Sequence, residues 1–99
     1  MIELNGGTPV FVDIDPNTLN ISIKDLKKKI SKQTRAIIPV HFAGQPVDMN
    51  SITEIIKGKK ITIIEDAAHA LGSYYKGKHV GINSDFTIFS FHPNKNITT

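Results

Sequence analysis

The sequence predicts an α/β fold built on a mostly parallel sheet. Two observations predict it. The hydrophobic pattern switches repeatedly between the two-residue period of a strand and the 3.6-residue period of a helix. A strand, a helix and a second strand also follow one another between residues 36 and 64, which is long enough for a crossover between parallel strands. A chain of 99 residues forms at most one small domain with a modest core.

The first elements are a strand and a helix. Residues 8–14 alternate between apolar and polar side chains and predict a strand. Ser22 and Asp25 have the spacing of a capping box, which indicates the start of a helix. Behind them, Leu26 and Ile30 recur at helical spacing among lysines, so we expect an amphipathic helix.

The crossover unit comes next. Residues 36–42 form a short apolar run that predicts a strand, although Pro39 cannot donate a hydrogen bond to a ladder. Asp48 or Asn50 is positioned to cap a helix, and Gly58 stands where that helix would end in a left-handed residue. Residues 61–64 predict the next strand.

The last third of the chain is less regular. Residues 67–71 predict a helical turn that stops at Gly72. Residues 74–80 resemble a small hairpin with Lys76 and Gly77 as its tight turn. Residues 86–91 predict a fourth strand, which Pro93 ends.

Composition excludes several classes of protein. The absence of cysteine excludes a disulfide scaffold, a thiolate zinc site and a cysteine nucleophile. No apolar run approaches the roughly 20 residues of a membrane span, and the first residues lack the shape of a signal peptide, so we expect a cytoplasmic protein. The net charge is +3, but the lysines cluster on the expected helices, where solvated surface explains them better than nucleic-acid binding.

Polar side chains gather beyond two of the expected strands. Asp66 and His69 follow residues 61–64, while Ser90 and Lys95 lie at the end of residues 86–91 and beyond it. Because ligands of α/β sheets collect at the carboxyl ends of parallel strands, these four side chains would share one edge. A lysine that forms an imine and a carboxylate that keeps a pyridine nitrogen protonated together describe a pyridoxal phosphate site.

Each residue also has a structural interpretation. Asp66 could cap the following turn, Lys95 could lie on the surface near a chain end, and Ser90 could bond to backbone. His69 could be a structural histidine. We expect His41 and His92 to be structural rather than catalytic and His79 to be exposed in the hairpin.

Five segments of the sequence together resemble the DegT/DnrJ/EryC1/StrS family of pyridoxal phosphate-dependent sugar aminotransferases. They are PVFVDID (9–15), AIIPVHFAGQPVD (36–48), EDAAH (65–69), YKGKHVG (75–81) and FSFHPNK (89–95). The resemblance implies an α/β fragment of the large domain of a fold-type I transferase, a three-layer α/β/α arrangement with a mostly parallel sheet. Residues 1–99 would form part of this cofactor-binding domain, without the small C-terminal domain.

The resemblance also implies roles for the four polar residues. Lys95 would bind the cofactor covalently and then serve as the catalytic acid–base, while Asp66 would pair with the pyridine nitrogen. His69 would lie against the ring and Ser90 would donate to the phosphate. No metal is implied. The amino donor would be glutamate, the acceptor a nucleotide-linked keto sugar, and the full-length enzyme a homodimer that binds neither nucleic acid nor membrane.

Two further expectations follow from the resemblance. The ending of the sequence is most similar to enzymes that aminate C4 of a UDP-linked 4-keto-6-deoxy-N-acetyl-hexosamine, in glycan biosynthesis, and Lys95 stands where the dehydratase branch has a histidine. Because family members are several times longer, the chain alone would be an incomplete and inactive fragment. The alternative is a small, non-catalytic α/β binding or interaction module derived from the same fold.

Overall fold

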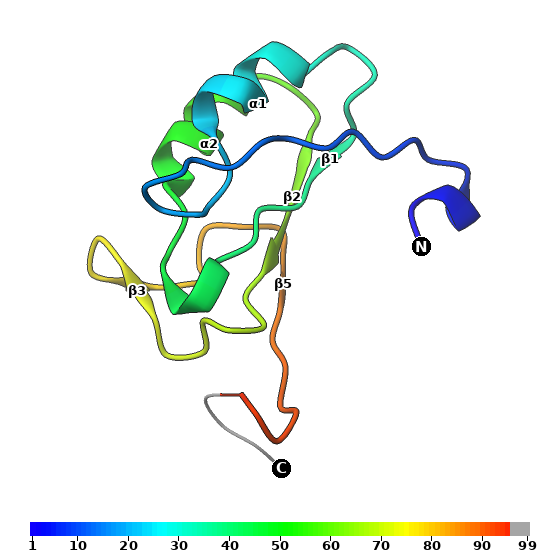
Figure 1. Cartoon of the computed structure of the whole chain (residues 1–99). Coiled ribbons are helices and arrows are strands. Elements are labelled where there is room, and N and C mark those ends of the chain that lie inside the picture. The colour runs from blue at the N-terminus through cyan, green and yellow to red at the C-terminus, as the bar shows by residue number, and fades with distance from the viewer. Residues whose placement is uncertain (96–99) are drawn as a thin grey trace.

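The framework of the molecule is a three-stranded parallel sheet with two helices packed together (Figure 1). The computed structural model describes residues 1–95. The central strand β2 lies between β1 and β5, and a separate antiparallel hairpin is formed by β3 and β4. In chain order the elements are η1 (Glu3–Asn5), α1 (Ile23–Lys29), β1 (Ala36–Ile37), η2 (Phe42–Gly44), α2 (Met49–Ile56), β2 (Thr62–Asp66), β3 (Tyr74–Tyr75), β4 (Lys78–His79) and β5 (Phe86–Ile88), where η marks a 3-10 helix.

The main core lies between the helices and one face of the sheet. Leu26 of α1 and Ile52 of α2 are buried against Ile37 of β1 and Ile63 of β2. The crossover from β1 through α2 to β2 therefore has the parallel strands that its sequence predicts. Buried alanines and Val80 form a second, smaller cluster, with Phe89 packed against it.

The opposite face of the sheet is apolar and open. The register pairs Ile64 with Phe86 and Asp66 with Ile88, so these side chains share a face. Phe86 is 63% exposed and Ile88 is 54% exposed. Parallel sheets are normally covered on both faces, but within residues 1–95 the helices supply only one of the two layers expected around this sheet.

Both helices begin at the residues that their capping patterns indicate. The Ser22 hydroxyl accepts a hydrogen bond from Asp25 N–H, and the Asp48 carboxylate accepts one from Ser51 N–H. Asp48 rather than Asn50 is thus the cap of α2. Only half of the predicted capping box forms, because the Asp25 carboxylate accepts from Asp13 N–H instead of returning to Ser22.

The strand predicted for residues 8–14 is wrong. Within it, only Ile14 forms a bridge, to Ile21, and Phe11 is 85% exposed. The backbone of this segment is bonded by side chains of α1 instead: Lys29 Nζ donates to Phe11 O, and Asp25 accepts from Asp13 N–H. An alternating sequence without a neighbouring strand has no ladder to join, which explains the error.

Two other strands are shorter than predicted. Of the strand predicted for residues 36–42, only Ala36 and Ile37 form the regular strand β1. After Pro39, a single bridge joins Val40 to Asp66. β5 ends at Ile88 instead of Phe91, because Ile88 pairs with Asp66, the last residue of its partner strand β2. β2 itself runs on to Asp66 rather than stopping at Ile64.

The hairpin is confirmed. Tyr74 and Tyr75 pair with His79 and Lys78, and the turn residues Lys76 and Gly77 have φ values of 48° and 80°. Two left-handed residues in succession are typical of the tight turn that suits the twist of a hairpin. Among residues 1–95, none of the helices has the length and apolar character required to cross a membrane.

Candidate functional site

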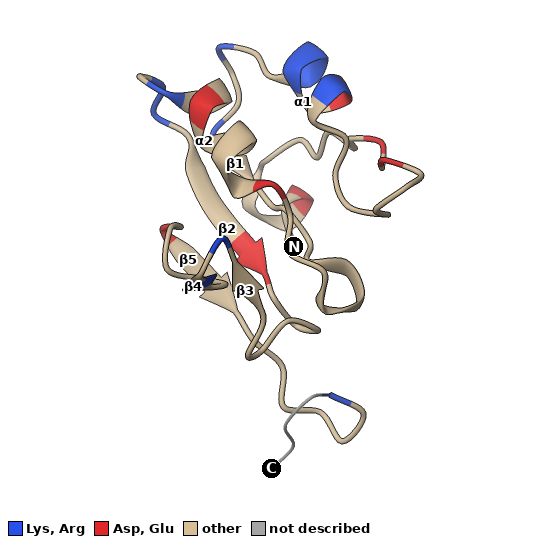
Figure 2. Ribbon diagram, turned by 90° about the vertical axis from the view of Figure 1, so that its left-hand side faces the viewer, with Lys and Arg blue, Asp and Glu red and all other residues tan. Residues whose placement is uncertain are grey.

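Asp66 is the last residue of the central strand. Its backbone is held on the β1 side, where Asp66 N–H donates to Pro39 O at 2.9 Å and His41 N–H donates to Asp66 O at 3.0 Å. The half-buried side chain accepts one hydrogen bond, from Ala68 N–H to Oδ1 at 3.1 Å. The other carboxylate oxygen accepts none of the hydrogen bonds found among residues 1–95. Figure 2 shows this acidic end of β2 lying apart from the basic residues around α1.

His69 lies in the turn that follows β2, and its side chain is exposed. This turn is pressed against η2: a Cβ added at Gly44 would lie 2.9 Å from His69 O. Gly44 also has a φ of +80°, and the preceding Ala43 has a φ of +51°. The loops that leave β1 and β2 are therefore in close contact at the carboxyl end of the sheet.

Ser90 and Lys95 lie beyond the end of β5. Both are half-buried. The Ser90 hydroxyl accepts from His92 N–H at 3.4 Å, and Lys95 N–H donates to His92 O at 2.8 Å. For the described part of the chain, no hydrogen bond or salt bridge joins any two of the four predicted site side chains. Asp66 ends β2 and His69 follows it, while Ser90 and Lys95 follow β5. The four residues thus lie at or beyond the carboxyl ends of two neighbouring strands, but no hydrogen bond or salt bridge found within residues 1–95 joins their side chains to one another.

A buried hydrogen bond between a histidine and a glutamate lies beside Asp66, and neither residue was assigned to the site from the sequence. His41 and Glu65 are 0% and 1% exposed, and His41 Nε2 lies 2.6 Å from Glu65 Oε2. Val47 N–H donates to His41 Nδ1 at 3.0 Å, so Nδ1 carries no proton and Nε2–H is the donor to Glu65. Glu65 Oε1 is buried and has no hydrogen-bond partner within the described residues.

A second buried polar residue holds the loop between β1 and α2. Asn20 is 5% exposed, donates to Gln45 O and Pro46 O, and accepts from Phe42 N–H. Neither Asn20 nor Glu65 was predicted as part of the site. In the sequence, each is a polar residue that follows an apolar one. That pattern does not reveal their hydrogen-bond partners, which lie 22 to 26 residues away along the chain.

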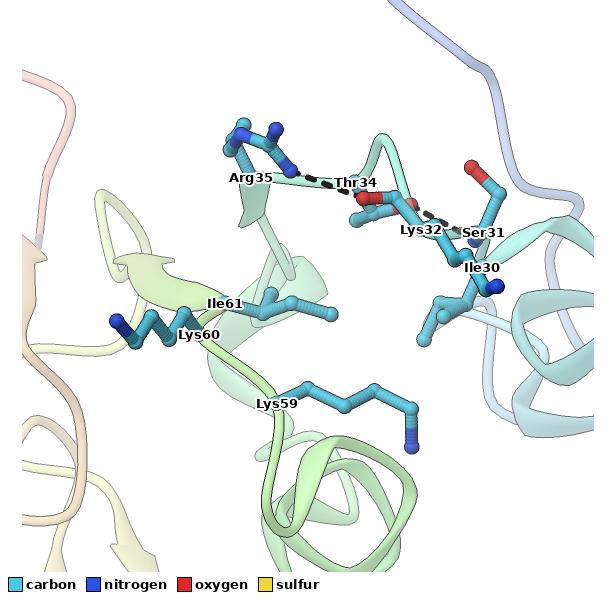
Figure 3. Close-up of a pocket in the computed structure, with 8 residues that line it drawn as sticks. All are labelled: Ile30, Ser31, Lys32, Thr34, Arg35, Lys59, Lys60 and Ile61. Atoms are coloured by element: carbon cyan, nitrogen blue, oxygen red, sulfur yellow. Dashed lines mark hydrogen bonds between the residues drawn. The ribbon is translucent and has the colours of Figure 1, made fainter.

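The basic hollow of the surface lies at the other end of the sheet. A groove of about 440 Å³ is lined by residues that precede β1 and β2, including Lys32, Arg35, Lys59 and Lys60 (Figure 3). The Arg35 guanidinium donates to Lys32 O and the Lys59 ammonium donates to Ile55 O. Two of these four cations are therefore hydrogen-bonded to nearby backbone carbonyls. Because ligands of such sheets bind at the carboxyl ends of the strands, this groove is not the candidate site.

Comparisons with known proteins agree on one family. The family model described as the DegT/DnrJ/EryC1/StrS aminotransferase family matches residues 1–99. The uncharacterized protein MJ1066 of Methanocaldococcus jannaschii is 53% identical over 91 residues, which cover 92% of this chain and 24% of that protein.

Solved structures extend the similarity to the fold. GDP-4-keto-6-deoxymannose-3-dehydratase (ColD), solved as an H188N mutant with bound GDP-perosamine, matches 98% of this chain and 25% of its own with 34% identity and a TM-score of 0.93. PseC of Helicobacter pylori, an aminotransferase involved in the biosynthesis of pseudoaminic acid, matches 97% of this chain and 26% of its own with 40% identity and a TM-score of 0.90. This chain spans about a quarter of the length of the relatives that it matches.

Proposed function

The chain belongs to the DegT/DnrJ/EryC1/StrS aminotransferase family, and from this premise we propose that it forms part of a pyridoxal phosphate-dependent enzyme that aminates a nucleotide-linked keto sugar. The family and its structural neighbours support sugar aminotransferase chemistry. One neighbour, the sugar aminotransferase Spr1654 of Streptococcus pneumoniae, is described as putative in its function and is solved in its PLP-form and PMP-form at 38% identity.

The observation that carries the proposal is the position and bonding of Asp66. Its carboxylate ends the central strand, is half-buried and keeps one oxygen without a donor in the described chain. This fits a group that pairs with a protonated ring nitrogen. When bound, the cofactor supplies an electron sink for the carbon that loses a proton.

The other residues contribute binding and proton transfer. The Lys95 amine would attach the cofactor and then carry the proton to and from the α-carbon of the amino donor. His69, exposed on the turn after β2, would lie against one face of the ring, and Ser90 would donate its hydroxyl to the phosphate. The backbone that carries Asp66 is already fixed by two hydrogen bonds, which favours a preorganised acidic partner.

The substrate assignment rests on Lys95 and on the neighbours. A lysine at this position favours amination over dehydration, since the dehydratase branch has a histidine there. One neighbour is a GDP-4-keto-6-deoxymannose-3-dehydratase with bound GDP-perosamine, and another is an aminotransferase involved in the biosynthesis of pseudoaminic acid. These similarities support a nucleotide-linked keto-deoxy sugar as the acceptor, with glutamate as the amino donor.

The chain would be inactive by itself and would work as part of a longer, dimeric, cytoplasmic enzyme. Two observations support this: the chain spans about a quarter of its relatives, and one face of its sheet leaves large apolar side chains exposed. A purified chain that turns over a keto sugar as a monomer would contradict this part of the proposal.

The test is covalent labelling with pyridoxal phosphate. The chain is mixed with the cofactor, the visible absorption is recorded, the adduct is reduced with borohydride and the modified residue is mapped by mass spectrometry. We expect labelling at Lys95 that disappears in Lys95→Ala and persists in Lys76→Ala, which removes an exposed hairpin lysine. No label at Lys95 would contradict the proposal and would favour the non-catalytic module.

A further inference from the structure

We propose that His41 and Glu65 are positioning residues that fix Asp66 and the turn carrying His69 at the candidate site. Neither side chain would touch the cofactor, because Glu65 and Asp66 are consecutive residues of β2 and point to opposite faces of the sheet. The part of the inference that concerns cofactor binding rests on the proposed function.

Several hydrogen bonds meet at the end of β2. His41 holds the peptide unit of Asp66 through its own N–H, and its ring holds the preceding residue through the 2.6 Å contact with Glu65. Pro39 O accepts from Asp66 N–H, and Ala67 N–H donates to Ile88 O. Every residue from Glu65 to Ala67 is therefore bonded to a neighbouring strand or to the segment that continues it.

The same histidine also fixes the neighbouring loop. His41 Nδ1 accepts from Val47 N–H, which sets the exit of the η2 loop. That loop presses Gly44 against His69 O, and Ser73 Oγ donates to Gly44 O at 2.8 Å. Displacement of the His41 ring would thus move both the loop after β1 and the turn after β2.

The pair of His41 and Glu65 is poorly suited to stabilising the fold. Both side chains are almost completely buried, and Glu65 Oε1 has no donor within residues 1–95. A buried pair with an unsatisfied oxygen is often less stable than an apolar pair of similar volume. A chain that needed only a packed core here would be served better by two leucines, which points to a requirement for geometry.

The experiment compares five proteins: the unaltered chain, Glu65→Gln, Glu65→Leu, the double variant His41→Leu/Glu65→Leu, and the matched control His79→Leu/Glu54→Leu at two exposed positions. Amide hydrogen exchange is measured without cofactor, and pyridoxal phosphate affinity is measured by its visible absorption. Asp66 and His41 amides report the site end of the strands. Thr62 N–H, bonded to Arg35 O at 2.9 Å, reports the opposite end.

In the double variant we expect the amide of Asp66 and the backbone amide at position 41 to exchange at least tenfold faster while Thr62 is unchanged. We also expect a cofactor affinity at least tenfold lower. Glu65→Gln retains an oxygen that accepts from His41, so it should keep both properties within about threefold, as the control should. A purely structural pair would change Thr62 together with Asp66, and that result overturns the proposal.

The outcomes separate the two proposals. If the unaltered chain binds no pyridoxal phosphate, the proposed function fails, but the exchange rates still decide the positioning role. If the double variant does not fold, the comparison of Glu65→Gln with Glu65→Leu decides it. Equal exchange at Asp66 in those two variants would overturn the inference.

Discussion

Replacement of His41 by leucine should destabilise the protein more than any exposed substitution. The change leaves the buried Glu65 carboxylate without the one hydrogen-bond partner that it has within residues 1–95, and breaking one side of a buried pair costs about 3–5 kcal/mol. Val47 N–H also loses its acceptor, worth about 1 kcal/mol. The expected loss of about 4–6 kcal/mol is a large part of the 5–15 kcal/mol available to a small domain.

Two further variants, Glu65→Leu and His41→Leu/Glu65→Leu, give the coupling free energy between the two side chains. Glu65→Leu leaves one unpaired N–H on His41, which costs about 1–3 kcal/mol. His41→Leu/Glu65→Leu removes both polar groups and should stay within about 2 kcal/mol of the unaltered chain. The two single losses then exceed the double loss by at least about 3 kcal/mol.

The assay is urea denaturation followed by circular dichroism, with all four corners of the cycle measured at the same pH. His79→Leu and Glu54→Leu, at exposed positions, provide a control cycle that should be additive within about 0.5 kcal/mol. Where His41→Leu shows no folded baseline, recovery of a cooperative transition in the double variant is the expected result. If the losses of unfolding free energy from His41→Leu and Glu65→Leu add up to the loss in the double variant, the predicted coupling between these side chains is wrong.

Two further changes test other parts of the molecule. Asn20→Ala removes three hydrogen bonds to the loop after β1 and should lower the free energy of unfolding by about 2 kcal/mol, whereas the exposed Asn17→Ala should not; equal effects in urea denaturation would contradict this. Hydrogen bonds from Ser51 and Tyr75 lower the pKa of Asp48, so its stabilisation is present above the ordinary carboxylate pKa and is lost as the pH falls through the lower folded value. Asp48→Asn keeps a capping residue, so the free energy of unfolding should fall less steeply below about pH 4 than in the unaltered chain. The same pH dependence in urea denaturation of both proteins would contradict this prediction.

Local signals in the sequence predicted local structure well. Ser22 and Asp48 begin their helices because a cap depends on residues three positions away. Lys76 and Gly77 turn the hairpin because two adjacent residues adopt left-handed conformations. The apolar runs around Ile37 and Ile63 gave the parallel pair because both runs are buried against the same helices.

Contacts between distant residues could not be predicted in the same way. The pairing of His41 with Glu65 depends on the register of two strands and on a histidine tautomer set by a third residue, Val47. The strand expected for residues 8–14 failed because strand formation depends on a neighbouring ladder, which alternation of side chains does not provide. The roles of Asp66 and Lys95 came from the resemblance of whole segments, and they remain predictions.

The most direct test of the central claim is a crystal structure of the protein with pyridoxal phosphate. We expect an Asp66 carboxylate oxygen within about 3 Å of the ring nitrogen and Lys95 Nζ joined to the opposite end of the same ring. A ring held on another lysine, or an Asp66 carboxylate turned away from it, would contradict the account.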